Sequence, residues 1–177
     1  MSKAVLISIR PEWCEKIISG EKTIEVRKTR PKMNPPFKCY IYRSVQGGVI
    51  GEFVCDDIFE RIVRVGAICE PPKYCICDWN MDCTPLDTLL ADACLTKDEL
   101  EKYLDGGVGY GWHISNLKIY DTPKELIEFH TWKKCKSCNK SGYESTACIY
   151  DENCIIPAAI TKAPQSWCYV EEEIWND

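Results

Sequence analysis

"SGEKTIEVRKTR", residues 19–30, combines a strand-like pattern with a high density of charge. Ile24 and Val26 alternate with Glu25 and Arg27, which is the period-two repeat of a β-strand that has two different faces. The apolar face of such a strand packs into a core. We therefore expect the opposite, charged face to line a polar cleft.

The segments on either side predict a small fold that mixes strands with short helices. "PEWCEKIISG", residues 11–20, has the proline start and the glycine end that are typical of a helix. The other expected elements are strands at 4–9, 39–44 and 49–63, a helix at 95–104, a strand and a short helix within 106–129, and a final strand within 164–175. Five or six short strands without a Gly-x-Gly-x-x-Gly motif, a P-loop or an internal repeat favour an α+β fold built on a mixed β-barrel.

Three local signals refine this picture. Thr96 is expected to cap the helix at 95–104, with Glu99 as its capping-box partner. Gly51, inside an apolar strand, predicts a bulge or a close approach of another backbone. Residues 66–85 have no clear period, and we expect them to form an irregular insertion.

Length and composition predict one domain that spans residues 1–177, with insertions at about 66–85 and 130–156. The chain has 177 residues, of which 45% are hydrophobic, and this is enough for one core. The apolar run before Arg10 is too short for a secretory signal peptide, and no run approaches the length of a membrane span. We expect a soluble, cytoplasmic protein without membrane association.

Charge is distributed unevenly along the chain. Ten Lys or Arg and four Glu give residues 1–44 a net charge of +6, whereas 12 basic and 23 acidic residues give the remainder −11. A basic segment on an acidic body indicates a local site for an anionic partner, while the overall acidity disfavours strong nonspecific duplex binding. The alternative is that the basic side chains neutralise acidic neighbours in the fold.

The thirteen cysteines favour reduced thiols over a disulfide framework, because their number is odd and no export signal precedes them. One group has a spacing suited to a metal and lies in "CKSCNKSGYESTACIYDENC", which is too polar to fold by apolar burial. Its members are Cys135, Cys138, Cys148 and Cys154. Four thiolates satisfy a tetrahedral structural zinc, so we expect a zinc-knuckle-like insertion; free thiols and a regulated disulfide are the alternatives.

A second group of cysteines has a less suitable spacing. Its members are Cys69, Cys75, Cys77 and Cys83. The Cys-x-Cys pair at its centre makes tetrahedral capture by all four awkward, so a second metal is not expected here. Several of the remaining cysteines stand where a small apolar residue would serve, as in "FKCYIY", and are expected to be buried thiols.

"GEKTIEVR", residues 20–27, matches the G-x-K-x-x-E-x-R signature of the ASCH domain, a PUA-like β-barrel. Two later stretches, "GYGWHISNLKIYDTPKELIEF" at 109–129 and "APQSWCYVEE" at 163–172, resemble a subgroup of bacterial and phage ASCH-domain proteins. The resemblance covers most of the chain outside residues 66–85 and 130–156. It implies a barrel whose polar cleft binds RNA or a nucleotide-like ligand.

The residues expected to contact this ligand come from the signature and from the glycine-rich stretch. They are Lys22, Thr23, Glu25, Arg27 and Trp112. Lysine and arginine side chains bind phosphate, a carboxylate accepts from exocyclic amines, and a base stacks on an indole ring. The alternatives are a surface ion pair between Glu25 and Arg27, and a Trp112 that belongs to the core. His113 is expected to be a hydrogen-bonded strand histidine rather than a catalyst.

Two further function classes stay open. Some relatives are proposed to act on RNA or on modified nucleosides, so the resemblance also implies, as an alternative, a ribonuclease-like hydrolase or one similar to N4-acetylcytidine amidohydrolase. Lys22 and Glu25 would then be an acid/base pair. The amidohydrolase relatives carry a threonine where this chain has Glu25, and that departure weakens the enzyme hypothesis. The third class is a protein-interaction module that uses the cysteine-rich insertion to bind a protein partner.

Overall fold

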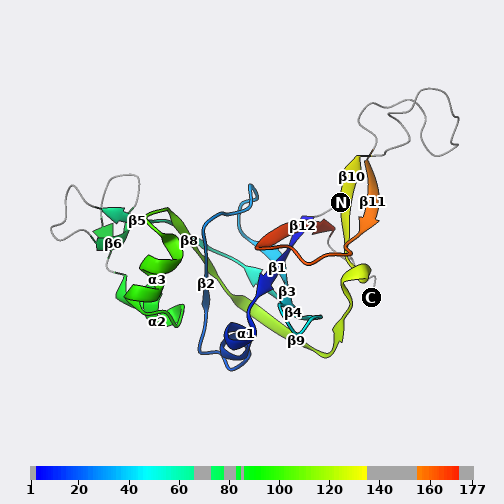
Figure 1. The fold of residues 1–177 in the computed structure, drawn as a ribbon, viewed down its shortest axis with the longest axis horizontal. Helices are drawn as coiled ribbons and strands as arrows, with labels where there is room; N and C mark the ends of the chain where they lie inside the picture. The colour runs from blue at the N-terminus through cyan, green and yellow to red at the C-terminus, as the bar shows by residue number, and fades with distance from the viewer. Residues whose placement is uncertain (1–2, 66–72, 78–82, 85, 135–154, 172–177) are drawn as a thin grey trace, which may run out of the picture.

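The computed structural model describes residues 3–65, 73–77, 83–84, 86–134 and 155–171 (Figure 1). Its largest layer is a five-stranded sheet in the order β12-β1-β3-β4-β9. These strands are β12 (Trp167–Glu171), β1 (Lys3–Ile9), β3 (Phe37–Arg43), β4 (Val49–Cys55) and β9 (Ser115–Lys124). β1 runs parallel to β3, and the other neighbours are antiparallel.

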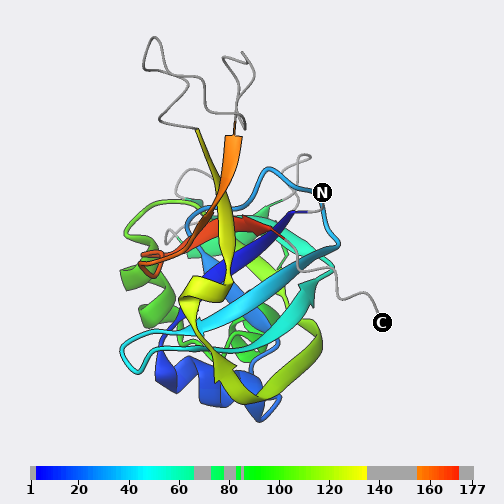
Figure 2. The same ribbon diagram turned by 90° about the vertical axis from the view of Figure 1, so that its right-hand side faces the viewer.

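A second five-stranded sheet, in the order β2-β8-β5-β6-β7, lies beside the first. It contains β2 (Ile24–Arg27), β8 (Gly109–His113), β5 (Ile58–Val65), β6 (Lys73–Cys77) and β7 (Cys83–Thr84). A two-stranded ribbon of β10 (His130–Lys134) and β11 (Ile155–Ala159) projects from the body (Figure 2). The helices among the described residues are α1 (Pro11–Ile18), α2 (Asp87–Asp92), α3 (Lys97–Leu104) and the short 3-10 turn η1 (Leu126–Glu128).

Both faces of β2 are covered, so all four of its residues are buried. Ile24 and Val26 pack in an apolar cluster with Leu89 of α2 and Leu100 of α3. The prediction that these two side chains face a core is confirmed. Glu25 and Arg27 lie on the opposite side of the strand, toward β1.

The α+β character is confirmed, but the strands that the structure describes do not close into a barrel. β1 pairs with β12 along one edge and with β3 along the other, so it has no edge left for β2. The side chain of Arg27 crosses between the two sheets and donates to the carbonyl of Ser8 on β1. A side-chain contact therefore joins β1 and β2 in place of a backbone ladder.

The expectation of five or six strands was too low, because short strands also form inside both insertions. β6 and β7 lie within residues 66–85, where we expected irregular structure. β10 precedes the segment that contains the first cysteine group, and β11 follows it. The strand expected at 49–63 is broken at Asp56 and Asp57 into β4 and β5. Short strands of this kind are formed by pairing with a neighbour and carry little period-two signal of their own.

Several local predictions are confirmed. α1 starts at Pro11 and is followed by Gly20 with φ of 79°. Thr96 and Glu99 form the capping box of α3. Gly51 lies at a register shift, and a Cβ placed there would be 2.5 Å from the carbonyl oxygen of Lys118, so only glycine fits this close approach.

Other predictions are met in part or stay untested. The short helix expected after Pro123 is only the turn η1. The four cysteines of the predicted zinc site lie outside the described residues, as does Cys69 of the second group. Cys77 and Cys83 are partners in the backbone register of β6 and β7. None of the described helices is long and apolar enough to cross a membrane.

Candidate ligand-binding pocket

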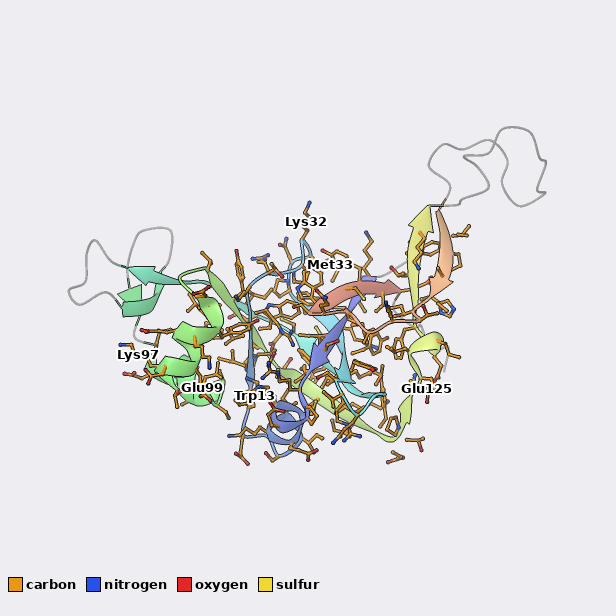
Figure 3. The ribbon with its side chains drawn as sticks, viewed as in Figure 1. Trp13, Lys32, Met33, Lys97, Glu99 and Glu125 are labelled. Atoms are coloured by element: carbon orange, nitrogen blue, oxygen red, sulfur yellow. The ribbon has the colours of Figure 1, made fainter. Side chains whose placement is uncertain are left out.

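A pocket of about 910 Å³ lies where α1, β2, α3 and the loop before β12 meet. This is within the range of small-molecule sites in proteins, roughly 300–1,000 Å³. Its lining includes three of the five predicted ligand-binding residues, which are Lys22, Glu25 and Arg27. Figure 3 shows Trp13 on α1 and Glu99 on α3, the two helices that flank β2 in this view.

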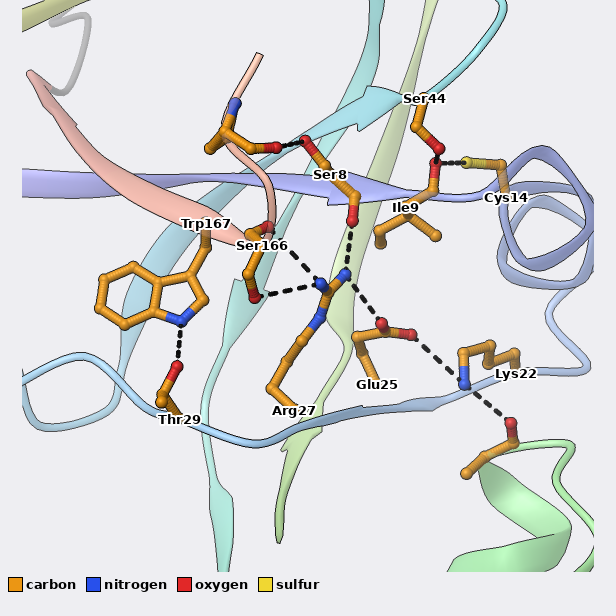
Figure 4. A network of polar contacts seen from close by, with 12 residues as sticks. Ser8, Ile9, Cys14, Lys22, Glu25, Arg27, Thr29, Ser44, Ser166 and Trp167 are labelled. Carbon is orange, nitrogen blue, oxygen red and sulfur yellow. Dashed lines mark hydrogen bonds and ion pairs between the residues drawn. The ribbon is translucent and has the colours of Figure 1, made fainter. Parts of the chain in front are cut away.

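Glu25 is held between two cations on the inner wall of this pocket (Figure 4). Its Oε1 lies 2.9 Å from Nη2 of Arg27, and its Oε2 lies 3.3 Å from Nζ of Lys22. Alternation along β2 puts Glu25 and Arg27 on one face, and Lys22 reaches the same point from the turn that follows α1. The three signature side chains therefore form one continuous charged cluster.

The cluster is buried, and this overturns the alternative of a surface ion pair. Each of the three side chains is at most 9% exposed. Exposed ion pairs contribute about 0.2–1 kcal/mol, whereas removing one partner of a buried pair costs about 3–5 kcal/mol. The signature residues are therefore expected to contribute to the stability of the protein.

Lys22 is fixed from several directions. Its Nζ donates to the carbonyl of Ala93, directly after α2, at 2.7 Å. The same ammonium lies 5.2 Å from the ring centroid of Trp13, within the range of a cation–π contact. Lys22 thus ties the end of α2 to β2 and to α1.

Arg27 holds the loop that forms the opposite wall. Its Nη2 donates to the Ser8 carbonyl at 2.6 Å, and its Nη1 lies 3.3 Å from the hydroxyl and 3.5 Å from the carbonyl of Ser166. Ser8 adds a hydroxyl bond to the Pro164 carbonyl at 2.6 Å. Arg27 and Ser8 together fix the loop 163–166 against β1 (Figure 4).

The other two predicted ligand-binding residues lie elsewhere. Trp112 is fully buried in the core, where it makes ring contacts with Phe37 and Trp167. Thr23 is outside the pocket lining, and its backbone N–H donates to the carbonyl of Asp92. The structure supports the alternative in which Trp112 belongs to the core.

Aromatic rings do line the pocket, but they come from other positions. Trp13 of α1, Tyr42 of β3 and Tyr103 of α3 are all in the lining. Burial raises the pKa of the Tyr103 hydroxyl, Arg27 lowers it and Glu25 raises it, so this phenol is close to the charged cluster. Sequence reasoning missed Tyr103 because a single tyrosine on an amphipathic helix carries no signal of its own.

His113 lies outside the pocket and pairs with Asp56. Its Nδ1 donates to the carboxylate at 2.6 Å, on a partly exposed part of the surface. This hydrogen bond lowers the pKa of Asp56, an effect that burial partly opposes. His113 is a hydrogen-bonded strand histidine, as expected.

Three of the described cysteines are buried thiols, whereas Cys94 and Cys168 are half-buried. Cys14, Cys39 and Cys55 are buried, and burial raises the pKa of Cys14 and of Cys55 to about 12. Such groups stay protonated at neutral pH and are poor nucleophiles and poor metal ligands. Within the part of the chain that the structure describes, no cluster of three or more potential metal ligands occurs.

The sequence of the pocket-forming segment matches a family model. The model of the ASCH domain aligns with residues 7–102, which is more than half of the chain. This chain belongs to the ASCH domain family. No curated protein matches it.

Solved structures of ASCH proteins share the fold. A crystal structure of an ASCH protein from Zymomonas mobilis superimposes with a TM-score of 0.56 at 17% identity, covering 96% of this chain and 88% of that chain. Crystal structures of two variants of the same protein also superimpose with a TM-score of 0.56 at 17% identity. The first match covers 97% of this chain and 92% of that chain, and the second covers 96% and 89%. At this identity the likeness concerns the fold alone.

One wall of the pocket lies beyond the segment that the ASCH model matches. Lys22, Glu25 and Arg27 fall within residues 7–102, whereas the loop 163–166 is more than sixty residues later. Ser166 still contacts Arg27. The pocket is therefore a product of the ASCH segment together with the C-terminal strand region.

Proposed function

We propose that this ASCH domain binds RNA or a nucleotide in the pocket that contains Lys22, Glu25 and Arg27. The observation that carries the proposal is a buried carboxylate held at 2.9 and 3.3 Å by two cations inside a pocket of about 910 Å³. Burying three charged groups is costly, and a pocket in which a few polar groups converge is the usual form of a ligand site. Family membership supports this function, because ASCH domains are generally RNA-binding, PUA-like modules.

The charged cluster suits the edge of a nucleobase. Each carboxylate oxygen can accept more than one hydrogen bond, so Glu25 can accept from an exocyclic amine while its ion pairs stay in place. Trp13 and Tyr42 supply rings at the same pocket, and stacking on an aromatic side chain contributes about 1–3 kcal/mol per base. Thr23 and Trp112 support this site from behind and are not proposed as contacts.

A hydrolase is the second candidate. The observation that favours it is the contact between Lys22 and Glu25 inside the pocket. In this arrangement Lys22 is a donor, because a carboxylate and a carbonyl both accept from its ammonium group. The pair would then polarise or protonate a substrate group rather than remove a proton from it.

The test is a titration of short single-stranded RNA and of ribonucleoside 5′-monophosphates against the wild-type protein and Lys22→Ala. It is run at low and at near-physiological salt, and each mixture is examined by mass spectrometry. We expect saturable binding that weakens with salt, because phosphate contacts release counterions, and that falls at least tenfold in Lys22→Ala. Product formation would support the hydrolase.

Lys118→Ala is the matched control, since Lys118 is exposed on β9 and does not line the pocket. Its affinity should equal that of the wild type, and circular dichroism should show that both variants are folded. Equal binding by all three proteins would contradict the proposed site. A wild-type protein that binds no RNA and no nucleotide would contradict the proposed function and leave a protein-interaction module.

A further inference from the structure

The two cations inside the pocket already contact protein groups, although the buried Nε of Arg27 has no hydrogen-bond partner among the described residues. Lys22 contacts Glu25 and the Ala93 carbonyl, while Arg27 contacts Glu25, Ser8 and Ser166. A phosphate placed among them would lie beside the Glu25 carboxylate in a poorly solvated site, where like charges repel strongly. The inner wall therefore suits an uncharged polar group, and the phosphate of a nucleotide needs another place.

Two exposed cations line the same pocket nearer to solvent. Arg10 directly precedes α1, its side chain is 76% exposed, and its one ion pair within the described part of the chain is a 3.9 Å contact to Glu12. Lys102 stands in the last turn of α3 and has no ion pair among the residues that the structure describes. Both can turn toward an anion without breaking a buried contact.

One acidic residue, Glu99, lines the pocket beside these cations. Its carboxylate accepts from the backbone N–H and the hydroxyl of Thr96, and these hydrogen bonds lower its pKa. Glu99 therefore stays charged and opposes an anion. Glu12, the ion-pair partner of Arg10, lies outside the pocket lining, so Arg10 and Lys102 face Glu99 as the one exposed carboxylate within that lining.

The turn between β3 and β4 adds a strained apolar residue at the same opening. Val45 lines the pocket, is 95% exposed and has φ of 71°. A β-branched residue in this left-handed region is strained, and such strain is often found at ligand contacts. Its methyl groups have little to pack against unless a ligand occupies the pocket.

We propose that the pocket takes a single nucleotide unit, with the base toward Glu25, the phosphate between Arg10 and Lys102, and Val45 packed on the sugar. The ligand class is therefore a ribonucleoside monophosphate or a phosphorylated chain end rather than an internal stretch of a polymer. This inference rests on the proposed function and fixes the orientation of the ligand in that site.

The test compares the four ribonucleosides with their 5′-monophosphates by calorimetric titration at low salt. Charge-assisted contacts to one phosphate correspond to roughly tenfold in affinity, so the monophosphate should bind about ten times more tightly than its nucleoside. In the double variant Arg10→Gln/Lys102→Gln this ratio should fall to about one, while the nucleoside affinity stays within about twofold. The double variant Lys32→Gln/Lys118→Gln removes the same charge from exposed lysines outside the pocket and should keep the tenfold ratio.

Equal affinity of nucleoside and monophosphate, or a tenfold ratio that survives Arg10→Gln/Lys102→Gln, would overturn the orientation and leave the proposed function standing. Binding of a single-stranded RNA hexamer without binding of any monophosphate would overturn the single-unit ligand. Absence of binding by every probe would contradict the proposed function itself, so the two failures are distinguishable.

Val45→Asn tests the contact at the pocket opening, because it should raise the melting temperature and lower the affinity for the ligand. Asparagine tolerates the left-handed region better than valine, so the melting temperature should rise. The affinity for nucleosides and monophosphates should fall about threefold together, because the apolar contact is lost. A higher melting temperature with unchanged affinity would overturn the assignment of Val45 to the ligand.

Discussion

Glu25 is the residue on which the charge balance of the pocket depends. It is the common partner of Lys22 and Arg27, and both cations are buried with it. If one cation is removed, the Glu25 carboxylate keeps its ion pair with the other cation. If the carboxylate charge is removed, two buried cations are left without a counter-charge. The three residues of the signature are therefore unequal in their effect on stability.

Glu25→Gln should lower the free energy of unfolding by about 3 kcal/mol, since it leaves uncompensated charge in a buried site. Lys22→Met should have a smaller effect, because Glu25 keeps its contact with Arg27. Urea denaturation monitored by tryptophan fluorescence measures both. Glu12→Gln, on an exposed carboxylate, is the control and should stay within about 0.5 kcal/mol of the wild type. A Glu25→Gln protein as stable as this control would contradict the buried cluster.

The pair of Asp56 and His113 should contribute a pH-dependent part of the stability. The pKa of Asp56 is lowered below its usual 3.8 by the hydrogen bond from His113. The stabilisation is therefore present above about pH 4 and is lost as the pH falls through the folded-state pKa. Asp56→Asn should cost roughly 0.5 kcal/mol near pH 7, because the pair is partly exposed, and progressively less as the pH falls below 4. Urea unfolding at pH 7 and at a series of pH values below 4 measures this cost, and a cost that does not decrease with pH would refute the prediction.

Residue-level prediction worked where the signal was local. The alternation of Ile24 and Val26 with Glu25 and Arg27 was sufficient to assign the two faces of β2. The contact between Arg27 and Ser166 spans 139 positions, and no local pattern of either residue predicts it. Trp112 was placed at the ligand because its neighbours match the family, whereas its burial depends on packing between two sheets.

Among the elements, α3 contributes both to the core and to the pocket lining. Leu100 and Leu104 pack against Ile24 and Val26 of β2. The other side of the same helix brings Lys102 and Tyr103 to the pocket. The stability of α3 and the shape of the pocket are therefore coupled.

Thr96→Ala should destabilise the protein by about 1 kcal/mol, since it removes the side-chain oxygen that accepts from the backbone N–H of Glu99. Thr96→Ser keeps that oxygen and should remain within a few tenths of a kcal/mol of the wild type. Thermal unfolding followed by circular dichroism measures both variants. Equal stability of the alanine and serine variants would show that the cap contributes nothing.

Elements with strong local signals were predictable, and those formed by pairing were not. The proline and glycine at the two ends of α1, and the capping box of α3, are encoded within a few neighbouring residues. β6 and β7 gain their structure from the ladder that begins at β5, so residues 66–85 looked irregular in isolation. The barrel prediction failed for the same reason, because the pairing of β1 with β3 and β12 is not visible in any single strand.

At the scale of the whole molecule, the basic N-terminal quarter contributes the cations of the pocket. Arg10, Lys22 and Arg27 all come from residues 1–44, which carry a net charge of +6. Two of these side chains are neutralised in part by Glu25, which matches the alternative in which basic groups offset acidic neighbours. Arg10 is exposed and contacts Glu12 at 3.9 Å, and we propose that it binds the anionic part of the ligand. The two interpretations of the charge asymmetry therefore apply to different residues.

The cysteine-rich segment gives a prediction that is independent of the pocket. Protein purified without chelator should contain about one zinc per chain, bound by Cys135, Cys138, Cys148 and Cys154 as a closed structural site. Elemental analysis measures the metal, and Cys135→Ser/Cys138→Ser should lose it. The double variant should keep nucleotide binding. A fully metal-free protein that is folded and monomeric would refute the zinc site.

The proposed nucleotide site lies in the pocket formed by α1, β2, α3 and the loop 163–166. The most direct measurement is a titration of the isotope-labelled protein with a ribonucleoside 5′-monophosphate, followed by amide chemical shifts in NMR spectra. We predict saturable shifts concentrated at residues 22–27, 102–103 and 165–166, which line or adjoin the pocket. Saturable shifts confined to residues away from the pocket, or no shift at residues 22–27, would contradict this site.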